Sequence, residues 1–221
     1  MVPSWLKIYQ VGGSIAGLMH GIVLKSLGHN VHILEAREPQ EMEAETAGLS
    51  LAVEAQQLMK AYLPEVKDYA MPPAPAIQVV DTHGEILVEL PIRFSSITST
   101  WGVVFQHLRD RFLQQDGNSG ISKFELRKRV LDVTDDGKVI MVMYQDNDQD
   151  SVNIIQADLV IAADGSNSTI RKKVLPNIES KSAGYVAWRG YVSESVIPET
   201  MKGLFDDKLI MTQFKNGYLL A

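Results

Sequence analysis

The stretch from Val11 to Arg37, VGGSIAGLMHGIVLKSLGHNVHILEAR, constrains the fold of this chain more than any other segment. A short apolar run ends at a glycine turn, Gly12-Gly13-Ser14, and apolar residues at helical spacing begin at Ile15. A second apolar run then ends at Glu35. The pattern predicts a βαβ unit with a glycine turn after its first strand and a carboxylate after its second.

This arrangement is typical of a dinucleotide site. Glycines let the backbone approach a pyrophosphate, whose charge is then stabilised by the free N–H groups and the dipole of the helix. Glu35 is placed to accept hydrogen bonds from ribose hydroxyls. The motif is G-x-G-x-x-G with Ser14 at the second glycine, where the hydroxyl can cap the helix or donate to a phosphate oxygen. A purely structural tight turn is the alternative interpretation.

Composition narrows the class of protein. The 221 residues carry a net charge of −6, which argues against a nucleic-acid surface, and 45% are hydrophobic, as in ordinary globular proteins. The chain has no cysteine, which excludes disulfides and thiolate metal sites. No apolar run approaches transmembrane length and no signal peptide is recognisable, so we expect a cytoplasmic location with no membrane partner.

Polar residues interrupt the first strand, and the chain before residue 98 contains the patterns of a helix and of a hairpin. Lys7, Tyr9 and Gln10 interrupt the apolar pattern of the first strand, which predicts an irregular start. A helix is expected from Val53 to Tyr62, and the proline-rich MPPAPAIQVV marks a change of subdomain. Alternating residues on both sides of Asp81-Thr82-His83-Gly84 predict a hairpin.

The middle of the chain predicts one helix and a β-meander. Ser99 or Thr100 can cap a helix whose apolar stripe leaves Arg109 to one side. Its members at helical spacing are Trp101, Phe105, Leu108 and Phe112. The segments expected to form the meander are Phe124–Leu126, Val130–Val133, Val139–Tyr144 and Val152–Ile155.

Two further segments carry candidate functional residues. Leu159–Ala163 predicts a buried parallel strand, and Asp164-Gly165 follows at the end where open α/β sheets bind ligands, although a simple turn would also suit these two residues. Ser166, Asn167 or Ser168 can cap the next helix. In GYVAWRG, Trp188 beside Arg189 is best interpreted as a core aromatic and a surface ion pair, with a strand to follow.

Together, the glycine turn ending in Glu35, the stretch LVIAADGSNSTIR and the segment YVAWRG resemble a known family. They are similar to the FAD-dependent aromatic hydroxylases with the para-hydroxybenzoate hydroxylase fold, nearest to the 2,6-dihydroxypyridine hydroxylase branch, which also carries GGS turns. The cofactor implied by the resemblance is FAD. The cofactor-binding residues that it implies are Gly12, Gly13, Ser14, Ala16, Gly17, Glu35, Arg37, Arg109, Val130, Asp164 and Gly165.

The resemblance also implies roles for individual residues. The glycine turn would meet the pyrophosphate and Glu35 the adenosine ribose, with Arg37 near the adenosine end. Arg109, or alternatively Gln106, would contact the ribityl–phosphate region. The backbone of Val130 would contact adenine. Asp164 and Gly165 would serve both FAD and the reducing nicotinamide cofactor, and Arg171 would orient them.

The activity implied is that of an NAD(P)H-using monooxygenase. NADH or NADPH reduces the flavin, and O2 is activated as a C4a-hydroperoxyflavin that hydroxylates a small aromatic or similar electron-rich substrate. The catalytic residues are unknown. The resemblance leaves open whether the protein forms a homodimer. Neither a nucleic acid nor a metal is expected as a partner. The alternative is a truncated, non-catalytic relative with weak or no FAD binding.

The fold class expected is α/β, a Rossmann-type FAD-binding domain with an inserted β-meander, interleaved with part of a β-rich substrate domain. We expect residues 5–70 and 99–176 to form the discontinuous FAD-binding domain, and residues 71–98 and 177–221 the partial substrate domain. The third motif of the family, a Gly-Asp followed by a proline-containing loop, is expected beyond Ala221. The resemblance therefore covers about the N-terminal half to three-fifths of such an enzyme.

Overall fold

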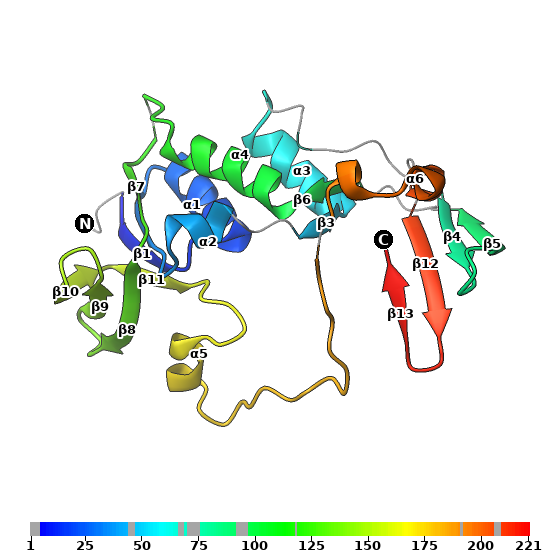
Figure 1. Ribbon diagram of the computed structural model, residues 1–221. Coiled ribbons are helices and arrows are strands. Elements are labelled where there is room, and N and C mark those ends of the chain that lie inside the picture. Colours follow the sequence, from blue (N-terminus) through cyan, green and yellow to red (C-terminus); the bar gives the residue numbers. More distant parts are fainter. Residues whose placement is uncertain are drawn as a thin grey trace.

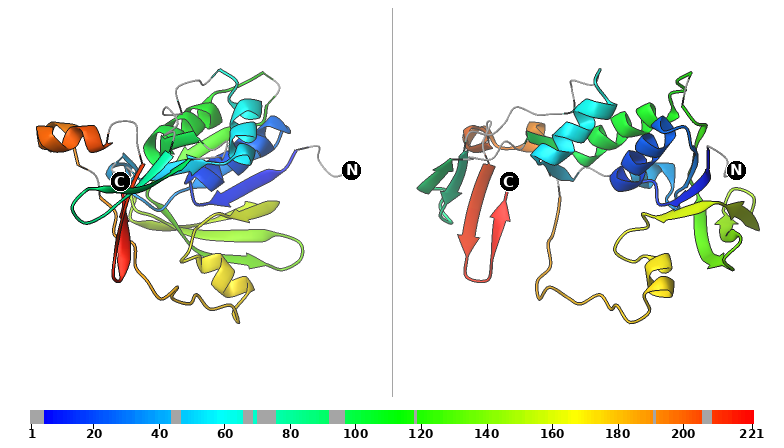
Figure 2. Two further views of the ribbon diagram at one scale, coloured as in Figure 1. Left: turned by 90° about the vertical axis from the view of Figure 1, so that its right-hand side faces the viewer. Right: turned by 180° about the vertical axis from the view of Figure 1, so that it is seen from behind.

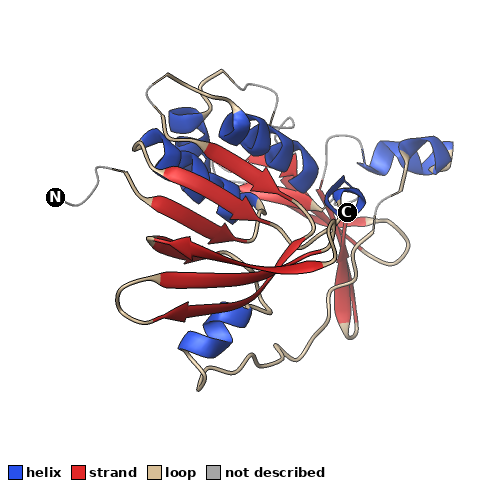
Figure 3. Ribbon diagram, turned by 90° about the vertical axis from the view of Figure 1, so that its left-hand side faces the viewer, coloured by secondary structure: helices blue, strands red, loops and turns tan. Residues whose placement is uncertain are grey.

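A parallel β-sheet forms the centre of the molecule. The computed structural model describes residues 5–43, 47–65, 69, 76–91, 97–117, 119–190, 192–205 and 209–221. Helices cover one face of the sheet, and an antiparallel meander covers the other (Figures 1 and 3). The strands of the sheet, from edge to edge, are β11 (Leu159–Ala162), β1 (Lys7–Val11), β2 (Asn30–Leu34) and β7 (Ser122–Glu125).

The predicted βαβ unit is confirmed as β1, α1 (Ile15–Ser26) and β2, with β1 and β2 parallel. The expected irregularity of β1 is wrong, because every residue from Lys7 to Val11 pairs in register with β2. Gln10 is fully buried within the strand, and Tyr9 is also buried. The polar residues are therefore accommodated in the layers on either side of the sheet and do not break its pairing.

The helical layer consists mainly of α1 and α4 (Trp101–Leu113), which pack against each other. The predicted apolar stripe of α4 is buried in the main core together with Ile8, Leu18 and Ile33. The N-cap is Thr100, whose Oγ1 accepts a hydrogen bond from the N–H of Val103 at 3.3 Å. This geometry settles the choice between Ser99 and Thr100.

The meander lies on the opposite face of the parallel sheet. Its strands are β8 (Lys128–Asp135), β9 (Ile140–Asp146) and β10 (Ser151–Ala157), in the order β10-β9-β8. Val130 and Val142 pack with Val11 and Leu34 of the parallel sheet in a second apolar cluster. The assignment of Phe124–Leu126 to the meander is wrong, because β7 pairs in parallel with β2 and extends the central sheet.

A separate sheet stands at one end of the molecule (Figures 1 and 2). The predicted hairpin around residues 81–84 is confirmed as β4 and β5, and β12, from much later in the chain, pairs in parallel with β4. The proline-rich residues 71–75 lie outside the described part. The strands, in sheet order, are β13 (Gly217–Leu220), β12 (Leu209–Phe214), β4 (Ala76–Val80) and β5 (Ile86–Pro91).

The remaining elements are short, and the predicted helix α3 is confirmed with the expected bounds. No helix among the described residues is long and apolar enough to cross a membrane. The elements are α2 (Pro39–Glu43), β3 (Gly48–Leu51), α3 (Val53–Tyr62), β6 (Ile97–Thr100), α5 (Thr169–Val174), the 3-10 helix η1 (Glu194–Val196) and α6 (Glu199–Phe205).

Three predictions for the later part of the chain are wrong. β11 is a parallel strand as expected, but it lies at the edge of the sheet, and its side chains are half-buried or exposed. Residues 177–190 form no helix or strand and run as an extended segment between α5 and α6 (Figure 1). Trp188 is 93% exposed and is no core residue, and a 3-10 helix lies where a strand was expected after Gly190.

Candidate functional site

Two glycines, one in the turn after β1 and one in the first turn of α1, are required by close backbone contacts. Gly12 has a φ of +99°, and a Cβ there would lie 2.2 Å from the carbonyl oxygen of Ala163, just after β11. A Cβ on Gly17 would lie 2.1 Å from the carbonyl oxygen of Gly12. Any side chain at either position would push the turn away from β11 or from α1. The turn is therefore held tightly against both neighbours.

Gly13 connects the turn to the end of β2. Its N–H donates a hydrogen bond of 2.7 Å to Oε2 of Glu35 in a buried position. A Cβ on Gly13 would lie 2.6 Å from the ring of Phe124 on β7. Sequence reasoning missed Phe124, because its contact with the turn depends on β7 joining the parallel sheet beside β2.

Ser14 and Ala16 lie at the N-terminus of α1. Ser14 has a φ of −76°, so its position does not require glycine, and its hydroxyl makes no capping hydrogen bond. The N–H of Leu18 is bonded to the carbonyl oxygen of Ser14 at 2.9 Å, so the N–H groups before it have no acceptor within the helix. Ala16 is exposed, and the first turn of α1 contains no acidic residue. This helix end can receive an anion.

Glu35 is only 5% exposed, and most of its acceptor capacity is in use. Oε2 accepts from Gly13, and Oε1 accepts from both the N–H of Arg37 at 3.0 Å and its Nε at 3.1 Å. A carboxylate offers about four acceptor positions, so one remains free on Oε2. The guanidinium of Arg37 also lies 5.4 Å from the ring centroid of Trp101, a partner that the sequence did not indicate.

Arg109 approaches the turn from α4. Its guanidinium lies 5.7 Å from the ring centroid of Phe124, whose ring contacts Gly13. The Nε of Arg109 is buried and has no hydrogen-bond partner among the described residues. Gln106, the alternative candidate, is exposed and donates to Asp110 at 2.8 Å. The geometry favours Arg109 as the residue of α4 that faces the site.

Asp164 and Gly165 follow β11 on the other side of the turn. Oδ2 of Asp164 accepts from the N–H of Thr169 at 2.9 Å, whereas Oδ1 is buried and unpartnered among the described residues. Arg171 donates to the carbonyl oxygen of Gly165 at 3.1 Å. The N-cap of α5 is Ser168, which accepts from the N–H of Arg171 at 2.9 Å. A cavity of about 310 Å³ lies beside this loop.

Val130 and Gln10 complete the surroundings of the site. Val130 lies on β8, two residues beyond Lys128, whose N–H donates to the carbonyl oxygen of Glu35 at 2.9 Å. Gln10 lies under the turn, with Nε2 3.4 Å from the carbonyl oxygen of Gly12 and with Oε1 buried and unpartnered among the described residues. The sequence showed Gln10 only as an interruption of the first strand.

The residues predicted from the sequence therefore converge around the carboxyl ends of β11, β1, β2 and β7. The close-packed glycines and the open N-terminus of α1 form a cradle that could hold a pyrophosphate, and Glu35 has one acceptor position left, which a ribose hydroxyl could use. The unpartnered Nε of Arg109 and Oδ1 of Asp164 are one donor and one acceptor at this edge. The described residues hold no cluster of histidine and carboxylate side chains that fits a metal ion. This donor set fits a dinucleotide.

The fold and the site define a dinucleotide-binding α/β protein of the Rossmann type. The chain belongs to the FAD binding domain family, whose model matches residues 7–217. It is 26% identical to 2,6-dihydroxypyridine 3-monooxygenase of Paenarthrobacter nicotinovorans over 223 residues, which cover all of this chain and 52% of that enzyme. The chain thus spans about half the length of this curated relative.

Solved structures share the fold. The tetracycline destructase Tet(55) matches all of this chain and 53% of its own, with a TM-score of 0.66 and 18% identity. The flavin-dependent monooxygenase PieE, solved in complex with FAD and substrate, matches 77% of this chain and 32% of its own, with a TM-score of 0.63 and 13% identity. The predicted fold class and the resemblance to aromatic-hydroxylase-type flavoproteins are confirmed.

Proposed function

We propose that this chain carries the FAD-binding part of an NAD(P)H-using monooxygenase that hydroxylates a small aromatic or similar electron-rich substrate. The observation that carries the proposal is the buried hydrogen bond of 2.7 Å between the N–H of Gly13 and Glu35, which fixes a carboxylate at the edge of a glycine turn. Membership of the FAD binding domain family and the monooxygenase relative support the choice of cofactor and reaction class.

The residues of the chain would bind and orient FAD. Ser14, Ala16 and Gly17 would present backbone N–H groups to the pyrophosphate. Gly12 and Gly13, whose N–H groups are bonded to the carbonyl oxygen of Leu34 and to Glu35, would let the backbone approach it closely. The free acceptor position of Glu35 would take a ribose hydroxyl, and Arg37, fixed against Trp101, would line the adenosine end.

Three further groups would complete the cofactor site. Arg109, whose Nε lacks a partner among the described residues, would donate to the ribityl–phosphate region. The backbone of Val130 would border adenine. Asp164 and Gly165, oriented by Arg171, would border both FAD and the nicotinamide reductant. When bound, the flavin supplies transfer of reducing equivalents from NADH or NADPH and activation of O2, while the protein positions the substrate and excludes water.

We also propose that the chain divides into a discontinuous FAD-binding domain, residues 5–70 and 99–176, and part of a substrate domain, residues 71–98 and 177–221. The pairing of β4 with β12 supports this division, because it joins segments from the two parts assigned to the substrate domain in one sheet. The central parallel sheet draws all its strands from the other two segments.

The test uses the full chain with two flavins. The purified protein should show flavin absorbance or quench the fluorescence of added FAD. FMN lacks the adenosine part, so it should bind at least about tenfold more weakly if the adenosine site carries the affinity. A colourless protein that gains no flavin absorbance when FAD is added would refute the proposed function. Equal affinity for FAD and FMN would refute the assignment of the glycine turn and Glu35.

A further inference from the structure

Arg127 has an unusual backbone conformation beside the candidate site. It lies at the bend between β7 and β8 with a φ of +60°, in the left-handed region that glycine occupies most easily. Among the described residues only Asp150 is another non-glycine residue with positive φ. A residue with a side chain costs free energy in this backbone conformation. Other interactions of Arg127 must therefore offset that cost.

The bend presents two consecutive N–H groups to the segment that follows β2. The N–H of Arg127 donates to the carbonyl oxygen of Arg37 at 3.2 Å, and the N–H of Lys128 donates to that of Glu35 at 2.9 Å. The N–H of Glu35 in turn donates to the carbonyl oxygen of Glu125 at 2.8 Å. The backbone on both sides of the Glu35 side chain is therefore fixed by the β7–β8 bend.

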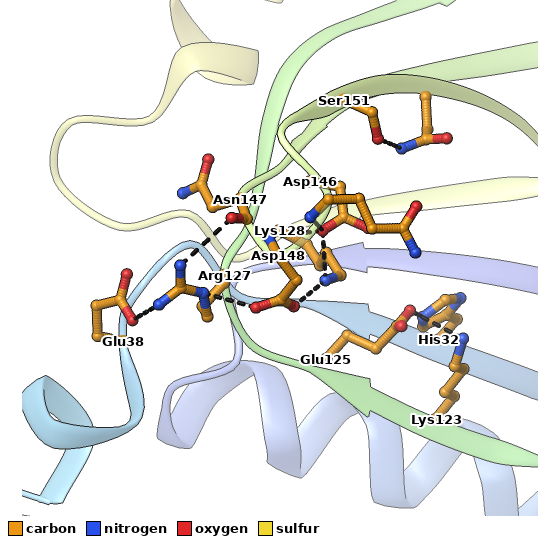
Figure 4. Close-up of polar contacts among 12 residues, drawn as sticks. His32, Glu38, Lys123, Glu125, Arg127, Lys128, Asp146, Asn147, Asp148 and Ser151 are labelled. Atoms are coloured by element: carbon orange, nitrogen blue, oxygen red, sulfur yellow. Dashed lines mark hydrogen bonds and ion pairs between the residues drawn. The ribbon is translucent and has the colours of Figure 1, made fainter.

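The side chain of Arg127 joins this bend to two other segments (Figure 4). Its Nη1 donates to the carboxylate of Glu38, three residues after Glu35, and its Nη2 donates to the carbonyl oxygen of Asn147 at 3.3 Å. Its Nε lies 2.7 Å from a carboxylate oxygen of Asp148. The two groups form an ion pair, but the N–H is not oriented for a hydrogen bond. Glycine would relieve the backbone strain, but only a long side chain can make these contacts.

A buried ion pair supports the same bend from the meander side. Nζ of Lys128 donates to Asp146 at 2.7 Å and to Asp148, and the side chains of Lys128 and Asp146 are each 7% exposed (Figure 4). Burial alone would lower the pKa of Lys128, but the hydrogen bonds to the two aspartates outweigh it and raise the pKa. The hydrogen bond from Lys128 lowers the pKa of Asp146, so both groups are charged at neutral pH and the bend is anchored to the turn after β9.

We propose that Arg127 is a positioning residue for the adenosine-ribose carboxylate. Its left-handed backbone and its contacts with Glu38, Asn147 and Asp148 hold the segment after β2 so that Glu35 points at the glycine turn. The assignment of Glu35 to ribose rests on the proposed function, whereas the positioning of Glu35 against Gly13 does not depend on any ligand.

The first test is made without ligand. Arg127→Gly keeps the left-handed backbone accessible and removes the side-chain contacts. Amide hydrogen exchange should become about tenfold faster at Gly13, whose N–H is bonded to Glu35, while exchange at Ile33 in the core of β2 stays unchanged. Arg129→Ala is the matched control, because Arg129 is exposed on β8 and carries the same charge. Unchanged exchange at Gly13 in Arg127→Gly would overturn the proposal.

The second test is a double-mutant cycle for FAD affinity. Arg127→Gly should raise the Kd for FAD roughly tenfold in the wild-type background, but less than about twofold in the Glu35→Gln background. Equal losses in both backgrounds would mean that Arg127 contributes only general stability, and the positioning role would be rejected. A wild-type chain that binds no FAD would reject the proposed function, and the exchange experiment would still decide the role of Arg127.

Discussion

The backbone N–H of Gly13 donates to the Oε2 of Glu35 at 2.7 Å, so the carboxylate that ends β2 is bonded directly to the turn that ends β1. The turn expected to bind the pyrophosphate and the carboxylate expected to bind the neighbouring ribose therefore form one unit. Displacing either group should disturb the other.

Replacing Glu35 with alanine tests this unit. The substitution leaves the N–H of Gly13 and a ribose hydroxyl without their acceptor, so FAD binding should weaken by about 1–3 kcal/mol. Titration of flavin fluorescence measures the change. Glu54→Ala, which removes an exposed carboxylate on α3, serves as control and should leave the affinity unaltered. An unchanged Kd for Glu35→Ala would remove Glu35 from the site.

Ser14→Gly should leave FAD affinity unchanged or improve it. The φ of Ser14 is −76° and its hydroxyl caps nothing, so neither backbone strain nor a lost cap accompanies the substitution. Glycine would only widen the space in front of the helix. The readout is the Kd for FAD by calorimetry. A large loss of affinity would show that the hydroxyl makes a necessary contact with phosphate.

Gly13→Ala should destabilise the protein by about 1–3 kcal/mol, because the new methyl group would lie 2.6 Å from the ring of Phe124. Urea denaturation measures the loss. Gly117→Ala is the control, since a Cβ at that position would meet no described atom within 4 Å and the φ of Gly117 is not positive.

If the clash is the cause, the losses for Gly13→Ala and Phe124→Val should be less than additive in the double variant. Full additivity would mean that the ring of Phe124 does not limit residue 13.

His32 should make stability depend on pH just below neutrality. Burial lowers the pKa of His32 below 6.5, with partial compensation from Glu125. As the pH falls, His32 therefore binds a proton in the unfolded chain at a higher pH than in the folded chain. The free energy of unfolding should fall as the pH drops below about 6.5, and it should continue to fall until the pH reaches the pKa of His32 in the folded chain.

His32→Gln should remove this slope, and His20→Gln on the exposed side of α1 should retain it. Urea midpoints at several pH values provide the measurement. Burial would raise the pKa of Glu125, but hydrogen bonds from Lys123 and His32 lower it below 4.5, so Glu125 remains charged throughout this range. A slope that persists in His32→Gln would contradict the assignment.

Local patterns were sufficient to predict the βαβ unit, the helix from Val53 to Tyr62 and the hairpin at residues 81–84. In each case neighbouring residues supply the signal, through glycine at a turn or apolar residues at a fixed spacing. The glycine turn, Glu35 and Asp164 could also be predicted, because each directly follows a predicted strand. The carboxyl ends of parallel strands lie at a common edge of the sheet.

Contacts between distant segments could not be predicted in this way. The assignment of β7 depends on its pairing with β2, and Phe124 and Arg127 acquire their roles only through that pairing. Nothing in the sequence around Arg127 indicates a left-handed backbone, because its compensating partners Glu38 and Asp148 lie far away in the chain. Trp188 fits a core residue by type, but the extended segment that carries it leaves the ring exposed.

The parallel pairing of β4 with β12 has a consequence for synthesis on the ribosome. The β4–β5 hairpin emerges early, but its sheet partner is translated only after more than half of the chain has followed. Until then the edge of β4 is unpaired and apolar side chains such as Ile86 and Leu87, exposed even in the folded chain, are accessible. Non-local parallel pairing forms slowly, so this hairpin is the part of the nascent chain where we expect chaperones to bind.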